Sequence, residues 1–152
     1  MDTKEMKEIH LIGISLPGKT TNEQGQSAID CGNLWQKFLT EGYATRIPAK
    51  LSDEMLAVYY DYEGDHTKPF AYFIGCKVAS GATPPEGMIR LTIPSGDYRL
   101  FIAKGRMPDC IADCWKAIWK SDISRAYSYD FEVYGEKSKD WNDAEVDVYI
   151  SI

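Results

Sequence analysis

A glutamate in the middle of an aromatic segment is the residue whose position in this sequence most suggests chemistry. The segment is SYDFEVY, residues 128–134. If it forms a strand, the alternation of side chains places Glu132 on one face with Asp130 and Tyr134, and Phe131 on the other. Burying a carboxylate is costly unless a positive or hydrogen-bonding group meets it. Glu132 is therefore the first candidate for a functional residue, against the alternative of a solvated charge on an open face.

Aromatic side chains are numerous enough for some of them to line a pocket, since the 152 residues include 4 Trp, 10 Tyr and 5 Phe. Aromatic faces attract cations by ~0.5 to 2 kcal/mol each, and a carboxylate in a low-dielectric pocket gains more from a positive partner than it would in water. This composition is typical of a site for an organic cation. We expect negative charge from Glu132 and, if strand 145–151 pairs with strand 127–134, from Asp147. The expected walls are Trp115, Tyr60, Tyr62, Tyr98, Tyr134 and Tyr149.

Two successive segments with the same β-α-β-β order must position these residues. The first comprises a strand at 7–16, a helix that begins at the capping-box sequence TTNE (20–23) and stops near Gly42, and strands at 55–63 and 70–79. The second comprises a strand at 88–104 bent at Pro94-Ser-Gly96, a helix that begins at Pro108, and strands at 127–134 and 145–151. The predicted fold class is therefore α+β.

The second helix carries apolar residues at the spacing of one buried stripe. They are Ile111, Cys114, Trp115, Ile118 and Trp119. Because this stripe is wide enough to meet different neighbours, we expect Trp115 to border the pocket. We expect Trp119, together with Phe38 of the first helix, to lie in the core.

Short sequence matches favour a duplication. The sequence YDYE at 60–63 returns as YDFE at 129–132. Two units are too few for a solenoid, so we expect two halves, about 5–80 and 87–152, related by a pseudo-two-fold axis within a single domain that spans 1–152. A Pro/Gly-rich connector at 80–87 joins them.

Charge, cysteine spacing and motifs exclude several function classes. The net charge of −6 comes without any Lys/Arg-rich run, so direct nucleic-acid binding is not expected. No apolar segment is long enough for a signal peptide or a membrane span, and we expect a cytoplasmic protein with reduced cysteines. The cysteines follow no paired metal spacing, so no metal site is expected. Neither nucleotide-binding fingerprint, GxGxxG or GxxxxGK[ST], occurs, and no cofactor is expected.

Six segments, in order along nearly the whole chain, resemble the GyrI-like small-molecule-binding domains, which are related to the effector-binding domains of AraC-type and MerR-type multidrug-sensing regulators. The segments are VYYDYE (58–63), YFIGC (72–76), IPSGDY (93–98), ADCWKAIW (112–119), DFEVY (130–134) and VDVYI (146–150). The resemblance implies a duplicated fold with a curved antiparallel sheet, two main helices and a central pocket. It also implies that Glu132 meets cationic lipophilic ligands.

Three hypotheses about function follow from the residues and the resemblance. The first is a binding domain that senses or sequesters hydrophobic cations. The alternative is a GyrI-like hydrolase of reactive cyclopropane-type compounds in which Glu132 is the general base, or a protective protein that contacts gyrase. Because only residues 1–6 precede the first expected strand, we expect a stand-alone ligand-binding domain without a helix-turn-helix domain in this chain. A homodimer and a further protein partner stay open.

Overall fold

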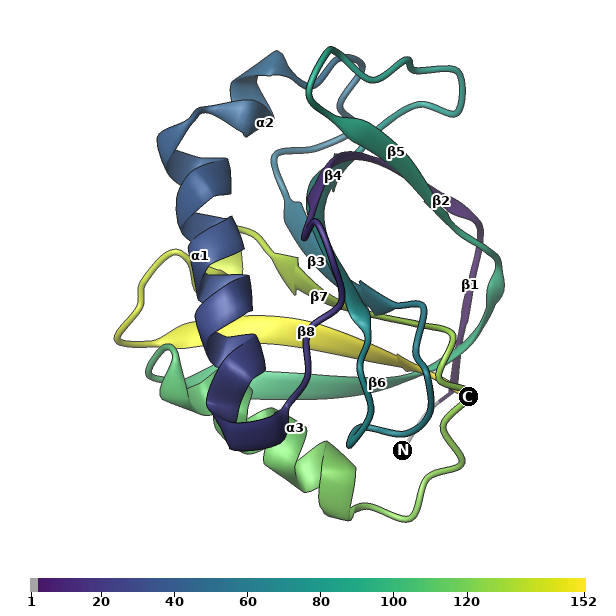
Figure 1. The fold of residues 1–152 in the computed structure, drawn as a ribbon, viewed down its shortest axis with the longest axis vertical. Coiled ribbons are helices and arrows are strands. Elements are labelled where there is room, and N and C mark those ends of the chain that lie inside the picture. Colours follow the sequence, from purple (N-terminus) through teal and green to yellow (C-terminus); the bar gives the residue numbers. More distant parts are fainter. Residues whose placement is uncertain (1–2) are drawn as a thin grey trace.

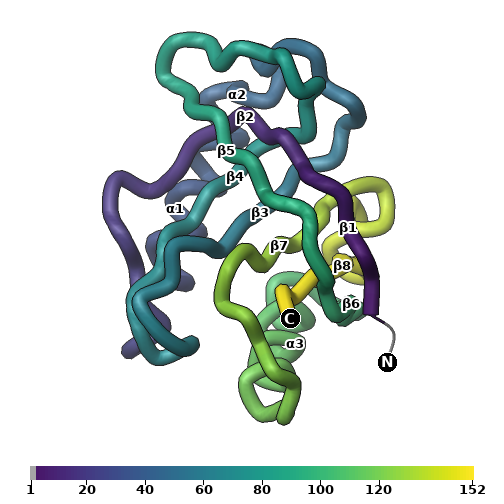
Figure 2. The backbone as a smooth tube through the Cα atoms, turned by 90° about the vertical axis from the view of Figure 1, so that its right-hand side faces the viewer, coloured from purple at the N-terminus to yellow at the C-terminus, as the bar shows by residue number. Residues whose placement is uncertain are grey.

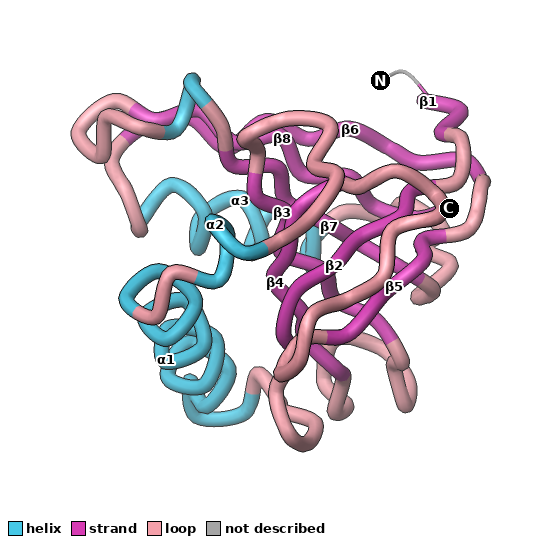
Figure 3. Tube along the Cα trace, turned by 90° about the horizontal axis from the view of Figure 1, so that it is seen from above, coloured by secondary structure: helices cyan, strands magenta, loops and turns pink. Residues whose placement is uncertain are grey.

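One antiparallel sheet of eight strands curls into a half-barrel, and the two main helices lie together on one side of it (Figure 1 and Figure 3). The computed structural model describes residues 3–152. The strands are β1 (Thr3–Met6), β2 (Ile9–Ser15), β3 (Met55–Tyr60), β4 (Ala71–Lys77), β5 (Ile89–Ile93), β6 (Gly96–Gly105), β7 (Tyr129–Tyr134) and β8 (Ala144–Ser151). The helices are α1 (Gln26–Thr40), the short α2 (Tyr43–Arg46) and α3 (Asp109–Lys120), with 3-10 turns at Glu23–Gly25 and Glu136–Ser138.

The order of the strands shows the duplication directly. From edge to edge it is β1-β6-β8-β7-β3-β4-β2-β5. The central pair is β7 and β3, and on each side of it the strands of one unit follow in the same order: β3, β4, β2 on one side and β7, β8, β6 on the other. This symmetric order confirms two β-α-β-β halves, with α1 and α3 after the first strand of each.

The outermost strands, β1 and β5, are exchanged between the halves. β1 precedes the first unit but pairs with β6, and β5 precedes the second unit but pairs with β2. Figure 2 shows β1, β2 and β5 on the side of the molecule away from α1. The strand predicted at 7–16 corresponds to β2, and a second strand, β1, precedes it. Lys7 and Glu8, which lie between the two strands, interrupt the pairing. The predicted bend at 94–96 separates β5 from β6.

The start of the first helix differs from the prediction. The capping box at 20–23 does not begin α1, which starts at Gln26 after Gly25 in a left-handed conformation (φ 72°). Thr20 instead forms a bridge with Phe70, and its hydroxyl donates to Asp30 Oδ2 at 2.6 Å. Thr20 is thus held by the sheet, and the helix must begin later. At the other end, Gly42 is left-handed (φ 66°) and follows the last residues of α1, as predicted.

Apolar side chains fill both faces of the sheet. α1 packs on the first half through Leu34 and Phe38, and Phe38 is 1% exposed, as expected for a core residue. α3 packs on the second half around Ile118. A third cluster, centred on Phe73 and Phe131, fills the inside of the curl on the face away from the helices. No helix within residues 3–152 is long and apolar enough to cross a membrane.

Candidate functional site

A cavity of about 1260 Å³ lies between the two main helices and the centre of the sheet. Trp35 of α1 and Trp115 of α3 line it from the helices, and Tyr59 of β3, Tyr72 of β4 and Glu132 of β7 line it from the sheet. The central strands of both halves thus contribute to one site. Ligand cavities are usually about 300 to 1,000 Å³, so this one has room for a drug-sized molecule.

Glu132 is the most buried charged residue of this cavity, with 1% of its surface exposed. Its Oε2 accepts hydrogen bonds from Trp115 Nε1 at 2.7 Å and from the Tyr59 hydroxyl at 2.9 Å. Its Oε1 accepts a hydrogen bond from the Tyr134 hydroxyl at 2.6 Å. Three neutral donors therefore hold the carboxylate, and no ion pair within residues 3–152 involves it.

The electrostatics of the carboxylate follow from this environment. Burial raises the pKa of Glu132 above its ordinary value of 4.5, while the hydrogen bonds from Tyr134, Trp115 and Tyr59 act to lower it. Burial, and then the charge of Glu132, raise the pKa of Tyr59 and of Tyr134 well above 10. The two hydroxyls therefore remain protonated donors, and Glu132 has no positively charged partner within residues 3–152.

Aromatic rings form the walls around this charge. The Tyr59 ring lies 4.8 Å from the Trp115 ring and 4.9 Å from the Tyr72 ring, measured between centroids. On the α1 side, Trp35 packs edge-on against Tyr134 at 4.9 Å, and its Nε1 donates to the Tyr72 hydroxyl at 2.8 Å. These contacts fix the rings relative to one another, so the cavity is largely formed before any ligand enters.

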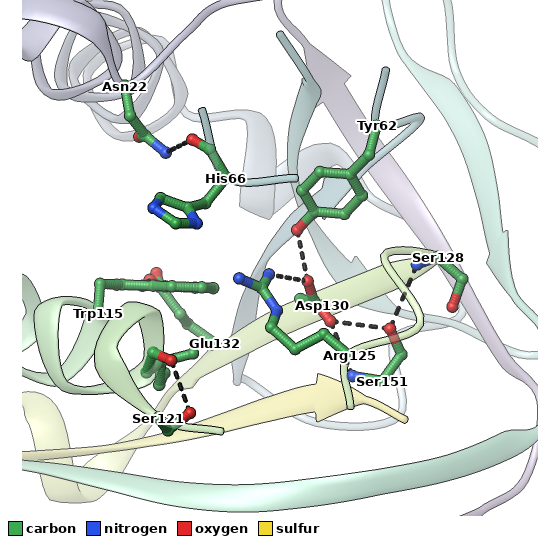
Figure 4. A network of polar contacts seen from close by, with 11 residues as sticks. Asn22, Tyr62, His66, Trp115, Ser121, Arg125, Ser128, Asp130, Glu132 and Ser151 are labelled. Carbon is green, nitrogen blue, oxygen red and sulfur yellow. Dashed lines mark hydrogen bonds and ion pairs between the residues drawn. The ribbon is translucent and has the colours of Figure 1, made fainter. Parts of the chain in front are cut away.

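A second buried carboxylate, Asp130, lies two residues before Glu132 on the same strand (Figure 4). Its Oδ2 accepts from the Tyr62 hydroxyl at 2.5 Å and from Arg125 Nη2 at 2.8 Å. Its Oδ1 accepts from the backbone N–H of Ser151 at 2.8 Å and from the Ser151 hydroxyl at 3.0 Å. Unlike Glu132, Asp130 therefore has a cationic partner within the protein.

The structure brings together four of the eight residues predicted for the site. Glu132, Trp115, Tyr134 and Tyr62 line the cavity. By strand alternation Tyr62 would face away, with Tyr60, but Asp61 between them is left-handed (φ 51°) and turns the chain. Tyr62 can therefore reach Asp130 at the end of the cavity.

The other four residues, Tyr60, Tyr98, Asp147 and Tyr149, lie outside the cavity. Tyr60 is directly opposite Tyr129 in the sheet, and their rings stack at 5.8 Å. Asp147 is opposite Val133, so it faces away from Glu132 and interacts with Lys137 instead. Tyr98 and Tyr149 both pack on Phe131 inside the curl. In each case the register of the sheet turns the side chain toward the face without helices.

Trp119 was predicted to lie in the core, and this prediction is wrong. It is only half-buried, it lines the cavity, and its ring stacks on His66 at 5.2 Å. Trp119 belongs to the last turn of α3, and there the loop between β3 and β4 meets the helix. The spacing of the apolar residues on α3 predicts that Trp119 packs against another part of the chain. It does not show whether that part is the sheet or a loop.

Four residues of the site were missed by the sequence analysis: Tyr59, Tyr72, Trp35 and Arg125. The strand that holds Tyr59 is apolar on both faces, so alternation could not show which of Tyr59 and Tyr60 faces the helices. Only the register of the sheet shows it: Ala57 lies opposite Glu132 and Tyr59 opposite Asp130, so Tyr59 shares the face of the two carboxylates. Arg125 lies in a connection without periodicity, and nothing in its sequence context marked it.

The thiols and the acidic groups of residues 3–152 are not arranged as a metal centre. Within the part of the chain that the structure describes, no three His, Cys, Asp or Glu side chains are arranged to hold a metal ion. All four cysteines are free thiols. Burial, and then the charge of Glu132, raise the pKa of Cys114 to about 11 and raise that of Cys31 further. Both therefore remain neutral thiols near the cavity.

Comparisons with known proteins agree with this fold. A solved integron cassette protein from Vibrio cholerae is 28% identical, with a TM-score of 0.73 and coverage of 99% of this chain and 94% of the other. The structure of SAV2435 bound to tetraphenylphosphonium has a TM-score of 0.74 at 16% identity, covering 99% and 92% of the two chains. At that identity the likeness shows the fold alone.

Two curated relatives are named as regulators. The transcriptional regulator BrlR of Pseudomonas aeruginosa is 30% identical over 128 residues, which cover 80% of this chain and 46% of BrlR. The chain therefore matches about half the length of that relative. YobU of Bacillus subtilis, named as a putative transcriptional regulator protein, is 22% identical over 78% of this chain and 77% of its own length.

The family comparison spans the whole described chain. The model of the Cass2 family, described as integron-associated effector binding protein, matches residues 3–152. The fold, the duplicated halves and this match agree, and the expected resemblance to GyrI-like effector-binding domains is confirmed. The chain belongs to the Cass2 family of integron-associated effector-binding proteins.

Proposed function

We propose that this domain binds hydrophobic organic cations in the cavity between the helices and the sheet, with Glu132 as their counter-ion. One observation carries the proposal. A carboxylate that is 1% exposed receives three neutral hydrogen bonds and has no cationic partner within residues 3–152. A buried charge without compensation costs free energy, and a cationic ligand removes that cost.

The walls of the cavity suit the same ligands. A cation within about 6 Å of an aromatic face is attracted by it, more strongly when both are removed from water. Trp115 and Tyr59 both contact the Glu132 carboxylate through their polar atoms and present their rings to the cavity. A flat or bulky lipophilic cation can therefore contact the rings while its charge remains close to the carboxylate. SAV2435, which shares this fold, is bound to such a cation, tetraphenylphosphonium, in its structure.

Binding is the step that this domain performs, and we propose sensing or sequestration as its purpose. The family is described as effector-binding, and BrlR and YobU are named as regulators. In a regulator, a bound effector acts by favouring one of two conformations of the protein or of its partner. A DNA-binding partner, or another domain that reads the ligand, belongs to this proposal.

The test uses two ions of the same shape and opposite charge. We expect tetraphenylphosphonium to bind to the wild-type protein and tetraphenylborate not to bind, measured by calorimetry. Glu132→Gln keeps the shape and removes the charge, so we expect tetraphenylphosphonium affinity to fall by about 10- to 100-fold, the range for a charged contact of about 1.5 to 3 kcal/mol.

Glu86→Gln is the matched control, because Glu86 is exposed and does not line the cavity. Its affinity should equal that of the wild type. Equal binding of the two ions, or an equal loss in both variants, would contradict the proposal. The same mixtures, followed by chromatography with a reactive cyclopropane compound, test hydrolysis: turnover that is lost in Glu132→Gln would replace binding with catalysis.

A further inference from the structure

A second polar group in the cavity has hydrogen-bonding capacity that the protein does not use. The Arg125 side chain is 4% exposed and lines the cavity. Its Nη2 donates to Asp130 Oδ2 at 2.8 Å. Its Nε and Nη1 are buried and have no hydrogen-bond acceptor among residues 3–152. Buried N–H groups without an acceptor are uncommon in folded proteins, because each loses its hydrogen bonds to water without replacing them, and the cost is greater when the group is charged.

The neighbours of Arg125 cannot supply the missing acceptor. Asp130 already receives four hydrogen bonds, from Tyr62, Arg125 and twice from Ser151, which is the full capacity of a carboxylate. The guanidinium carbon lies 4.3 Å from the ring centroid of Tyr127. A ring face attracts the positive charge, but it offers no oxygen lone pair to an N–H group.

The arrangement gives the cavity two polar ends. Trp115 separates them: its Nε1 donates to Glu132 Oε2 at 2.7 Å, and its ring centroid lies 5.7 Å from the guanidinium carbon of Arg125. Figure 4 shows the free end of the guanidinium directed toward Trp115, below the imidazole of His66. Trp115, His66 and Arg125 all line the cavity. A ligand that lies along the Trp115 indole can therefore meet Glu132 with one part and Arg125 with another.

The three buried charges beside the cavity indicate what the second part of the ligand is, because the other charged residues that line it, Asp53, Glu54, Lys116, Glu136 and Lys139, are at least partly exposed to water. Glu132 and Asp130 carry two negative charges and Arg125 one positive charge, so the three groups leave one negative charge. A monocation with a neutral oxygen brings the sum to zero. A zwitterion brings no net charge and leaves the negative charge uncompensated at a buried site.

We propose, resting on the proposed function, that the ligands of this domain are lipophilic monocations that also carry a neutral acceptor oxygen, such as a carbonyl, and that Arg125 selects them. The oxygen accepts from Nε or Nη1 of Arg125 while the cationic centre faces Glu132. Arg125 keeps its bond to Asp130 throughout. Arg125 is thus a specificity-determining residue, and Glu132 supplies the affinity for positive charge.

Three phosphonium probes of similar size test this inference in the wild-type protein. They are benzyltriphenylphosphonium ions that carry a methyl ester, an isopropyl group or a carboxylate at the 4-position of the benzyl ring. We expect the ester to bind about tenfold more tightly than the isopropyl probe, the low end of the range for a hydrogen bond to a charged group. We expect the carboxylate, a zwitterion, to bind more weakly than the ester. Equal affinities, or a preference for the carboxylate, would overturn the inference.

Arg125→Lys assigns the preference to its residue. Lysine keeps the charge beside Asp130 but lacks the planar guanidinium donors, so the preference for the ester should fall below about threefold while the isopropyl probe binds as before. Arg106→Lys, at an exposed arginine outside the cavity, should keep the tenfold preference. A full preference in Arg125→Lys would overturn the assignment.

The two proposals fail in different ways. If Glu132→Gln weakens all three probes but the wild type does not distinguish ester from isopropyl, the proposed function stands and this inference is wrong. If none of the probes binds, the proposed function and this inference are both wrong. The wild-type comparison decides the matter even if Arg125→Lys does not fold.

Discussion

Two buried carboxylates on one strand, Asp130 and Glu132, differ in the partners that surround them. Both lie on the face of β7 that is turned toward the helices, and neither is more than 1% exposed. Asp130 is near the start of the strand, where the chain between α3 and β7 brings Arg125 and the end of β8 brings Ser151. Glu132 is at the middle of the strand, where only the rings of the cavity reach it.

The difference separates a structural charge from a charge available to a ligand. Asp130 accepts four hydrogen bonds, one of them from a guanidinium, so its charge and its lone pairs are satisfied within the protein. Glu132 accepts three hydrogen bonds, all from neutral groups, and borders a cavity. Burial alone therefore does not distinguish the two carboxylates, and we propose Glu132 as the binding residue because it lies beside a cavity without an internal cation.

The largest expected effect is the loss of stability when Asp130 is replaced. Asp130→Asn removes the negative partner of Arg125, whose side chain is 4% exposed. Removing one member of a buried ion pair costs about 3 to 5 kcal/mol, because the remaining charge is left uncompensated. We expect the free energy of unfolding, measured in urea, to fall by this amount. Glu132→Gln should leave it unchanged or higher, because it removes a buried charge that has no cationic partner.

The contrast between the two variants is the result that matters. A decrease of several kcal/mol in Glu132→Gln would mean that Glu132 holds the fold together, as Asp130 is expected to do. An unchanged stability in Asp130→Asn would mean that the ion pair with Arg125 contributes little. The slope of the unfolding transition should be the same in all three proteins, since a change in slope would indicate an altered unfolded or native state.

Strand alternation predicts which face a residue occupies in some strands of this sheet and not in others. The residues of β7 alternate in polarity, so the sequence predicted that Glu132 and Tyr134 share a face. β3 and β4 lie at the centre of the sheet with apolar residues on both faces. In such strands the periodicity is lost, and only the register with a partner strand shows that Tyr59 and Tyr72 face the cavity.

The register also explains the position of Asp147. The sequence placed Asp147 beside Glu132 because their strands were expected to pair. The strands do pair, but Glu132 lies opposite Val148, one residue away. A shift of one residue turns a side chain to the other face of the sheet. Arg125 could not be predicted at all, because its neighbours in space, Asp130 and Trp115, meet it only through the folded connection after α3.

The second largest expected effect is a dependence of tetraphenylphosphonium binding on pH, caused by protonation of Glu132. Burial raises the pKa of Glu132 above 4.5, so protonation begins at a higher pH than for an ordinary glutamate. A proton then competes with the cationic ligand. We expect the affinity for tetraphenylphosphonium, measured by calorimetry, to fall by about tenfold for each unit of pH below the folded-state pKa of Glu132, as expected for one competing proton.

The contribution of Glu132 to the stability of the wild-type protein should become more favourable as the pH falls, whereas the affinity for the cation decreases. The folded-state pKa of Glu132 is raised, so burying the ionised form costs stability above that pKa, and the cost disappears as the pH falls through it toward the unfolded-state value. The difference in unfolding free energy between Glu132→Gln and the wild type should shrink over the same range. If Glu132→Gln keeps the wild-type pH dependence of binding, a group other than Glu132 is responsible for it.

The smallest expected effect compares two neighbouring tyrosines on opposite faces of β3. The Tyr59 hydroxyl donates to Glu132 Oε2 at 2.9 Å, whereas Tyr60 stacks on Tyr129 on the other face. Tyr59→Phe removes one of the three donors that stabilise the ionised carboxylate, so the pKa of Glu132 should rise. We expect the midpoint of the pH dependence of tetraphenylphosphonium binding to move upward by about one pH unit, which corresponds to about 1.4 kcal/mol.

Tyr60→Phe makes the same chemical change one residue along the strand and should leave the midpoint where it is in the wild type. The pair thus tests the face assignment and the electrostatics together, because only a hydroxyl in contact with the carboxylate can change its proton affinity by this mechanism. An equal shift in both variants would point to a general loss of stability instead. A shift in Tyr60→Phe alone would mean that the ligand binds inside the curl, on the face that holds Tyr98 and Tyr149.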